Sequence, residues 1–145
     1  MIIAFDMDGT LADLYGVKGW LADLLAEKTD PYERAKPLVN LSVFARTVHK
    51  LQAHGYKFAV VSCTSKGGSE AYKKRIAVAK QKWLKQHLPS VKWDEIFIID
   101  YDTPKVSVVN EPSILFDDEE RHRKAWNGIA YDEKEILKRL KALLA

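Results

Sequence analysis

A chain of 145 residues, 47% hydrophobic and 30% charged, has the size and composition of one globular domain and leaves little room for two. Its one cysteine, Cys63, excludes an internal disulfide, and no residues have paired zinc-ligand spacing, so we expect a cytoplasmic protein. No apolar run approaches the roughly 20 residues that span a bilayer, so no membrane segment is expected. The net charge of +3 permits a nucleic-acid or phosphate ligand without favouring one.

Five short segments rich in Val, Ile and Phe predict buried β-strands. They are IIAFD near residue 2, KFAVVS near residue 57, EIFIID near residue 95, SILFDD near residue 113 and GIAYD near residue 128. These runs lack a clean alternation of apolar and polar residues, which is typical of a parallel sheet covered on both faces.

Three helical patterns accompany these strands. The first begins after Asn40, a favoured N-cap type, and ends before Gly55, a typical C-terminal stop. The second covers residues 69–88, with Tyr72, Ile76, Ala79 and Trp83 as its apolar stripe. Its basic residues are expected mostly on the opposite, solvated face: Lys73, Lys74, Arg75, Lys80, Lys82 and Lys85. The third helix begins near Asp132 and Glu135, which have capping-box spacing.

This alternation of strands and helices predicts the fold class. We expect an α/β protein, a three-layer α/β/α sandwich with a mainly parallel, Rossmann-like sheet, formed by residues 1–145 as a single domain. Residues 14–39 interrupt the alternation, because a helical pattern there is followed by Pro31 and Pro37. We favour a small cap-like insert over the site; the alternative is an ordinary crossover helix with a long loop.

Polar residues follow the predicted strands at the edge where ligands bind in sheets of this kind. The residues that meet there are Asp6 and Asp8 after the first strand, Ser62, Cys63 and Thr64 at the end of the second, and Asp117 and Asp118 after the fourth. Carboxylates about 4 Å apart repel by roughly 4 kcal/mol per pair at an effective dielectric near 20. Mg²⁺ would relieve that repulsion, and it is often held by carboxylates together with a substrate phosphate. Lys105, between the third and fourth strands, would bring a positive charge to the same edge.

These residues resemble the four motifs of the haloacid dehalogenase (HAD) superfamily of phosphohydrolases, in the same order. The segment FDMDGTLAD is similar to the first motif, FAVVSCTS to the second, Lys105 to the third and ILFDDEE to the fourth. The resemblance covers residues 1 to about 120 and implies a HAD-like fold with a minimal cap. The CTS and DD strings are similar to those of the deoxyribonucleotidase branch.

The resemblance also implies a role for each residue at the edge. Asp6 would be the nucleophile that forms an aspartyl-phosphate, and Asp8 the general acid/base, which also lends its backbone carbonyl to Mg²⁺. Asp117 would be a side-chain metal ligand and Asp118 would hold a metal water or the lysine. Ser62, Cys63 and Thr64 would bind the substrate phosphate together with Lys105. We favour Ser62 over Thr64 as the second-motif hydroxyl, and expect Cys63 to be a small buried residue beside it.

The leading functional hypothesis is a magnesium-dependent phosphomonoesterase for a small phosphorylated substrate, with a nucleotide favoured as in 5′-nucleotidases. A polynucleotide 3′-end phosphatase is the enzymatic alternative, because an open site and a basic helix suit nucleic acid, which remains a possible but less favoured partner. A non-catalytic binding module with the same fold is the alternative of another class. Asp118 has a competing role as the cap of the following helix, and His122 is expected at the surface.

Overall fold

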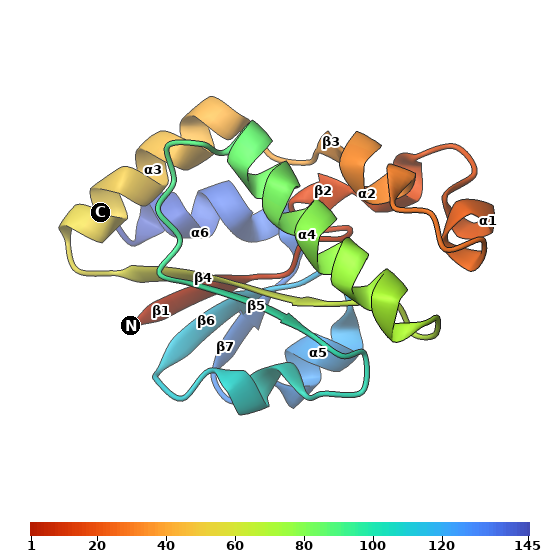
Figure 1. The fold of residues 1–145 in the computed structure, drawn as a ribbon. Helices are drawn as coiled ribbons and strands as arrows, with labels where there is room; N and C mark the ends of the chain where they lie inside the picture. Colours follow the sequence, from red (N-terminus) through yellow and green to blue (C-terminus); the bar gives the residue numbers. More distant parts are fainter.

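The computed structural model describes residues 1–145 and has a five-stranded central sheet flanked by helices (Figure 1). The strand order is β5-β4-β1-β6-β7, and every pairing in the sheet is parallel. The strands are β1 (Ile2–Phe5), β4 (Lys57–Cys63), β5 (Glu95–Ile99), β6 (Ser113–Phe116) and β7 (Ile129–Tyr131). The predicted α/β class, the five strands and the parallel sheet are therefore confirmed.

Helices cover both faces of the sheet. The helices α3 (Leu41–Ala53), α4 (Glu70–His87) and α6 (Ile136–Ala142) lie on the upper face in Figure 1, and α5 (Glu120–Ala125) lies below with the 3₁₀ helix η2 (Lys105–Val108). Successive residues of β1 serve the two faces: Ile3 and Phe5 belong to a cluster of 19 buried residues, Ile2 and Ala4 to one of seven. A strand buried on both sides cannot alternate in polarity, which explains its continuous apolar sequence.

The helix ends follow local hydrogen bonding. The Asn40 side chain accepts a hydrogen bond from the Val43 amide and caps α3, as predicted, and Ser69 caps α4 in the same way. Asp132 caps a short 3₁₀ helix, η3 (Glu133–Glu135), that leads into α6. Glu135 makes no capping box, because its carboxylate pairs with Arg139 at 3.4 Å.

The segment between β1 and α3 forms a small substructure at the carboxyl end of the sheet, at the right of Figure 1. It contains β2 (Ala12–Asp13), the 3₁₀ helix η1 (Leu14–Gly16), α1 (Trp20–Leu25), α2 (Asp30–Arg34) and β3 (Lys36–Pro37). The antiparallel pairing of β2 with β3 closes it. We call residues 12–37 the insert.

The insert is fastened to the N-terminal part of α4. The Glu27 carboxylate accepts hydrogen bonds from the backbone N–H and the hydroxyl of Ser69, at 2.8 and 2.9 Å. The Tyr72 hydroxyl donates to the Lys28 carbonyl at 2.8 Å, and the Arg75 guanidinium donates to the Glu27 carbonyl. These contacts come from one helix, so the position of the insert depends on α4.

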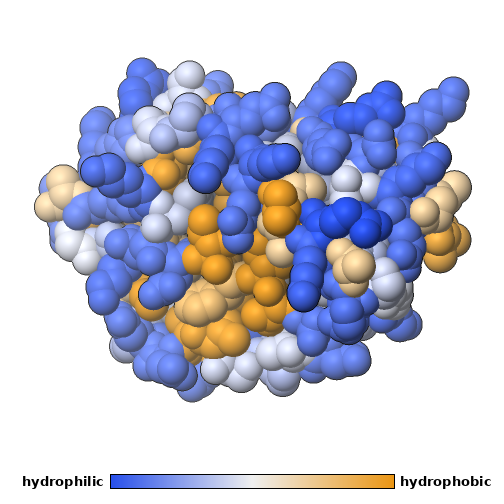
Figure 2. All heavy atoms as spheres, viewed as in Figure 1, coloured by the Kyte–Doolittle hydropathy of each residue, from blue (hydrophilic) through white to orange (hydrophobic).

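Both edge strands of the sheet, β5 and β7, are partly exposed. An apolar patch crosses the middle of the face shown in Figure 2, over β5 and the adjoining part of α4, where Ile96 and Val78 are exposed. None of the helices combines the length and the apolar character needed to cross a membrane.

Candidate active site

The centre of the site is a buried lysine between two aspartates. Lys105 donates to Asp6 Oδ1 at 2.9 Å and to Asp117 Oδ2 at 2.7 Å. Asp6 follows β1, Asp117 follows the neighbouring β6, and Lys105 begins η2, so three separate segments supply this group. The sequence-predicted association of these three residues is present in the structure.

Asp118 completes a cluster of carboxylates. Asp6, Asp117 and Asp118 each offer an oxygen, and these oxygens all lie within 4.8 Å of one another. The Thr10 hydroxyl lies 3.2 Å from Asp118 Oδ1 and 3.3 Å from Asp6 Oδ2, and it accepts a hydrogen bond from the Asp118 amide. Asp118 does not cap α5, whose N-cap residue is Glu119.

Gly9 explains why glycine follows the second aspartate of the first motif. Its φ is +79°, a conformation that residues with a side chain rarely adopt. A Cβ atom at this position would also lie 2.3 Å from the nearer carboxylate oxygen of Asp118. Only glycine lets the loop after β1 pass this close to Asp118 in the loop after β6.

The charges of the cluster are unbalanced. Burial opposes the ionisation of Asp6, but the charge and hydrogen bond of Lys105 together with the charge of Lys80 lower the pKa of Asp6 below its ordinary value. Burial and the Asp6 charge raise the pKa of Asp117 to about 6 and that of Asp118 to about 8. One lysine thus faces three carboxylates. The donor set consists of oxygens alone, and it fits a hard divalent cation such as Mg²⁺.

Asp8 points toward a second buried lysine. Lys80 donates to Asp8 Oδ2 at 2.8 Å, to the Ser62 hydroxyl at 2.7 Å and to the Cys63 carbonyl at 2.6 Å, which satisfies all three of its N–H groups. The side chain of Lys80 is 1% exposed. Asp8 therefore stands apart from the side-chain cluster, and only its backbone remains for the metal role that the resemblance implies.

The expectation that Lys80 lies on the solvated face of its helix is wrong. Lys80 comes four residues after Ile76 and three before Trp83, so it lies on the same face of α4 as the apolar stripe. This spacing alone predicts a buried position for Lys80, whereas its charge is typical of an exposed one. A lysine is buried this deeply only when its ammonium is paired, and Asp8 supplies the partner.

The hydroxyls after β4 divide between two environments. Ser62 is completely buried against Lys80 and does not line the cavity described below, because β4 extends through Cys63. Thr64 does line the cavity, and its buried Oγ1 atom has no hydrogen-bond partner. The structure therefore does not place the favoured Ser62 hydroxyl at the cavity, and Thr64 becomes the candidate for the second-motif hydroxyl. Cys63 is half-buried and also lines the cavity, and burial raises the pKa of its thiol.

A cavity of about 450 Å³ lies between these residues and the insert. Asp6, Asp8 and Lys105 are among its lining residues. The insert contributes an apolar wall: Leu14, Tyr15, Trp20, Leu21, Leu24, Leu25 and Tyr32. The rings of Tyr15 and Trp20 meet edge to face, with centroids 5.0 Å apart.

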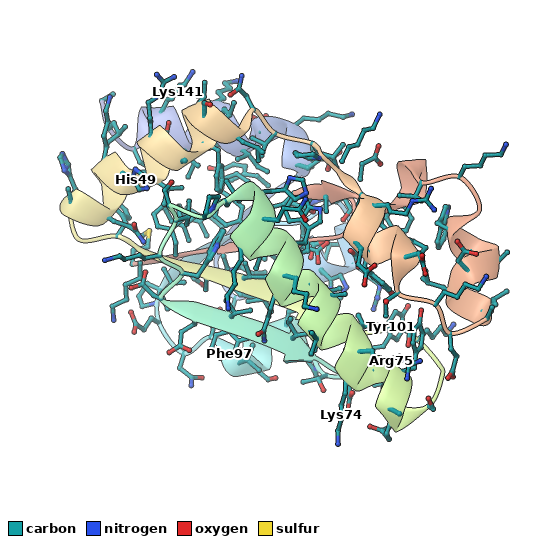
Figure 3. The ribbon with its side chains drawn as sticks, turned by 45° about the horizontal axis from the view of Figure 1, so that its top comes forward. His49, Lys74, Arg75, Phe97, Tyr101 and Lys141 are labelled. Carbon is teal, nitrogen blue, oxygen red and sulfur yellow. The ribbon has the colours of Figure 1, made fainter.

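Other charged and polar residues of the wall come from the loop before α4, the loop after β5 and the start of α5. They include Lys66, Tyr101, Glu119, Arg121 and His122. His122, expected at the surface, is only 11% exposed at its side chain. Burial, together with Lys105 and Arg121, lowers the pKa of His122 to about 4, so the ring is neutral at pH 7. Figure 3 shows Tyr101 near the N-terminal end of α4, where Lys74 and Arg75 lie.

No protein-family model matches the chain, and no similar sequence is found among curated proteins. A functional assignment therefore depends on the geometry of this site and on the motif resemblance.

Proposed function

We propose that the protein is a magnesium-dependent phosphomonoester hydrolase of the HAD superfamily, acting through an aspartyl-phosphate on Asp6. The observation that carries this proposal is the ionised Asp6 carboxylate, which lines the cavity while Lys105 holds one of its oxygens. A carboxylate fixed in this way can act as a nucleophile. The four motifs of the resemblance support the same assignment.

The first step is attack of an Asp6 oxygen on the substrate phosphorus. A bond forms between that oxygen and phosphorus, and the bond from phosphorus to the leaving oxygen breaks. Asp8, which lines the same cavity, protonates the leaving oxygen. Burial raises the pKa of Asp8 although its ion pair with Lys80 opposes the shift, and a raised pKa brings a carboxyl closer to the working range of a general acid.

The second step is hydrolysis of the aspartyl-phosphate. Asp8, now ionised, takes a proton from water, the water oxygen bonds to phosphorus, and the bond to Asp6 breaks to release phosphate. Among the lining residues, Thr64 and Lys105 would donate to the oxygens of the transferred phosphoryl group. Asp6, Asp117 and Asp118 would hold Mg²⁺ with their side chains, and the bound ion would neutralise the charge of the phosphate dianion.

The cavity supports a nucleotide as the substrate class. Its volume of about 450 Å³ lies within the range of small-molecule sites. The insert offers apolar and aromatic side chains, among them Tyr15 and Trp20, which suit a flat, weakly polar base. The polynucleotide alternative would rely on the basic residues of α4 other than Lys80, which is buried.

The proposal is tested by hydrolysis of p-nitrophenyl phosphate with Mg²⁺ and with EDTA. We expect turnover only with Mg²⁺, and we expect Asp6→Asn to lower kcat by at least about 10³-fold, because an amide is not a nucleophile. Exposed Asp30, on α2, provides the matched control, Asp30→Asn. Full activity in chelator would refute the metal requirement. Undiminished activity in Asp6→Asn would refute the nucleophile, and a protein with no phosphatase activity on any substrate would leave the non-catalytic binding module as the better hypothesis.

A further inference from the structure

The cavity wall opposite the insert contains an arginine held by two contacts. The Nε of Arg121 donates to Glu119 Oε2 at 2.7 Å. The guanidinium carbon lies 4.7 Å from the centre of the Tyr101 ring, so the group stacks on that ring. The two terminal nitrogens make no hydrogen bond to the protein, and the side chain is 49% exposed. Arg121 is thus fixed in position while its bidentate donor edge stays free.

A second cation faces the same ring. The Lys66 ammonium lies 5.9 Å from the centre of the Tyr101 ring, and Lys66 forms no ion pair with any carboxylate. Lys66 comes from the loop after β4, Tyr101 from the loop after β5 and Arg121 from α5, so three separate segments converge here. All three residues line the cavity that contains Asp6.

The proposed chemistry at Asp6 has no use for these cations. Lys105 already accompanies Asp6, and Thr64 is the unpartnered hydroxyl of the wall. A free guanidinium edge is a favourable binder of phosphate, because its paired N–H groups match two phosphate oxygens. On the basis of the proposed function, we propose that Arg121 and Lys66, positioned by Tyr101, form a subsite for a second phosphate group on the substrate. The favoured substrate class is then a nucleoside bisphosphate.

The test compares kcat/KM for adenosine 3′,5′-bisphosphate with kcat/KM for adenosine 5′-monophosphate and adenosine 3′-monophosphate. We expect the bisphosphate to be preferred by about tenfold or more over both. In Arg121→Gln that preference should fall about tenfold, mostly through a higher KM, and Lys66→Gln should lower it less. Lys124→Gln is the matched control on the same helix, because Lys124 is exposed and pairs with Glu120.

Tyr101 is a positioning residue, and its variants separate stacking from mere folding. Tyr101→Phe keeps the ring and should keep the preference, whereas Tyr101→Leu should lose most of it. Equal kcat/KM values for the bisphosphate and the monophosphates would refute the subsite but not the phosphatase activity. The same conclusion would follow if Arg121→Gln lowered kcat/KM equally for the bisphosphate and the monophosphates. The absence of hydrolysis on every substrate would instead refute the proposed function. If the protein hydrolyses none of these substrates, the ratio of its affinities for the bisphosphate and the monophosphates, measured by calorimetry, still tests the subsite.

Discussion

Replacing Asp118 with Asn should raise the melting temperature of the protein in chelator. Asp118 lies in the cluster with Asp6 and Asp117, and its pKa is raised to about 8 by burial and by the Asp6 charge. Its ionisation in the folded protein is therefore unfavourable. An asparagine oxygen can still accept the hydrogen bond from Thr10, so the substitution removes a charge and keeps the shape.

The magnitude follows from the separation of the charges. Two unit charges 4.8 Å apart repel by about 3.5 kcal/mol at an effective dielectric of 20. Solvent screening of this partly exposed carboxylate reduces the gain in unfolding free energy to roughly 1–2 kcal/mol. For a chain of this length each kcal/mol shifts the melting temperature by about 2–5 °C, so we expect a rise of about 2–10 °C.

The effect should depend on pH with a definite sign. A carboxyl whose pKa is higher in the folded than in the unfolded state loses stability as pH rises from the unfolded value of 3.8 to the folded value of about 8. The advantage of the variant should therefore be largest near pH 8.5 and small near pH 4. Mg²⁺ should raise the melting temperature of the parent more than that of the variant, because the variant offers one carboxylate fewer.

The assay is thermal unfolding followed by tryptophan fluorescence, for parent and variant, in EDTA and in Mg²⁺, at both pH values. Glu120→Gln is the control, because Glu120 is an exposed acid of α5 whose ion-pair partner is Lys124. A variant that melts at or below the parent in EDTA at pH 8.5 would show that the carboxylates do not repel as calculated. A variant that gains as much from Mg²⁺ as the parent would exclude Asp118 from the metal site.

Two further predictions concern the residues around β4. Lys80→Met should lower the free energy of unfolding by about 3 kcal/mol, because it leaves Asp8 and Ser62 without their hydrogen-bond partner. Urea unfolding measures this loss, and the control Lys82→Met, at an exposed residue of the same helix, should not show it. Thr64→Val should not lower the urea midpoint, since Oγ1 is buried without a partner, but it should raise KM for p-nitrophenyl phosphate about tenfold. An unchanged KM would remove Thr64 from the phosphate site.

The strands and the aspartates were predictable because each is determined locally. A strand buried on both faces has to be continuously apolar, and in a parallel sheet the residues that follow β1 and β6 must meet at one edge. The order of the motifs then located Lys105 as well. These inferences need only the chain direction and the rule that the carboxyl ends of parallel strands meet at one edge of the sheet. The contacts among Asp6, Lys105 and Asp117 agree with them.

The errors arose where a side chain's surroundings come from a distant segment. Lys80 carries a charge that is typical of a solvated face, but it lies on the apolar face of α4 and its partner Asp8 is 72 residues away in the chain. Ser62 and Thr64 would share a face in a continuous strand, but β4 ends at Cys63, so Ser62 lies inside the sheet and Thr64 in the loop that follows it. His122 is largely buried because it lines the cavity together with residues of the insert and of the loop after β5.

The single helix α4 connects the insert, which forms the apolar wall of the cavity, with the proposed acid/base Asp8 and with the core. Its first turn holds the insert through Ser69 and Tyr72, its middle holds Asp8 through Lys80, and Trp83 packs into the main core. An 18-residue helix moves as a rigid rod over this length, so its parts cannot shift independently. The insert and Asp8 consequently belong to one cooperative unit of the native state. A fluctuation that undocks α4 would move the insert away from the cavity and break the contact between Lys80 and Asp8 in the same event.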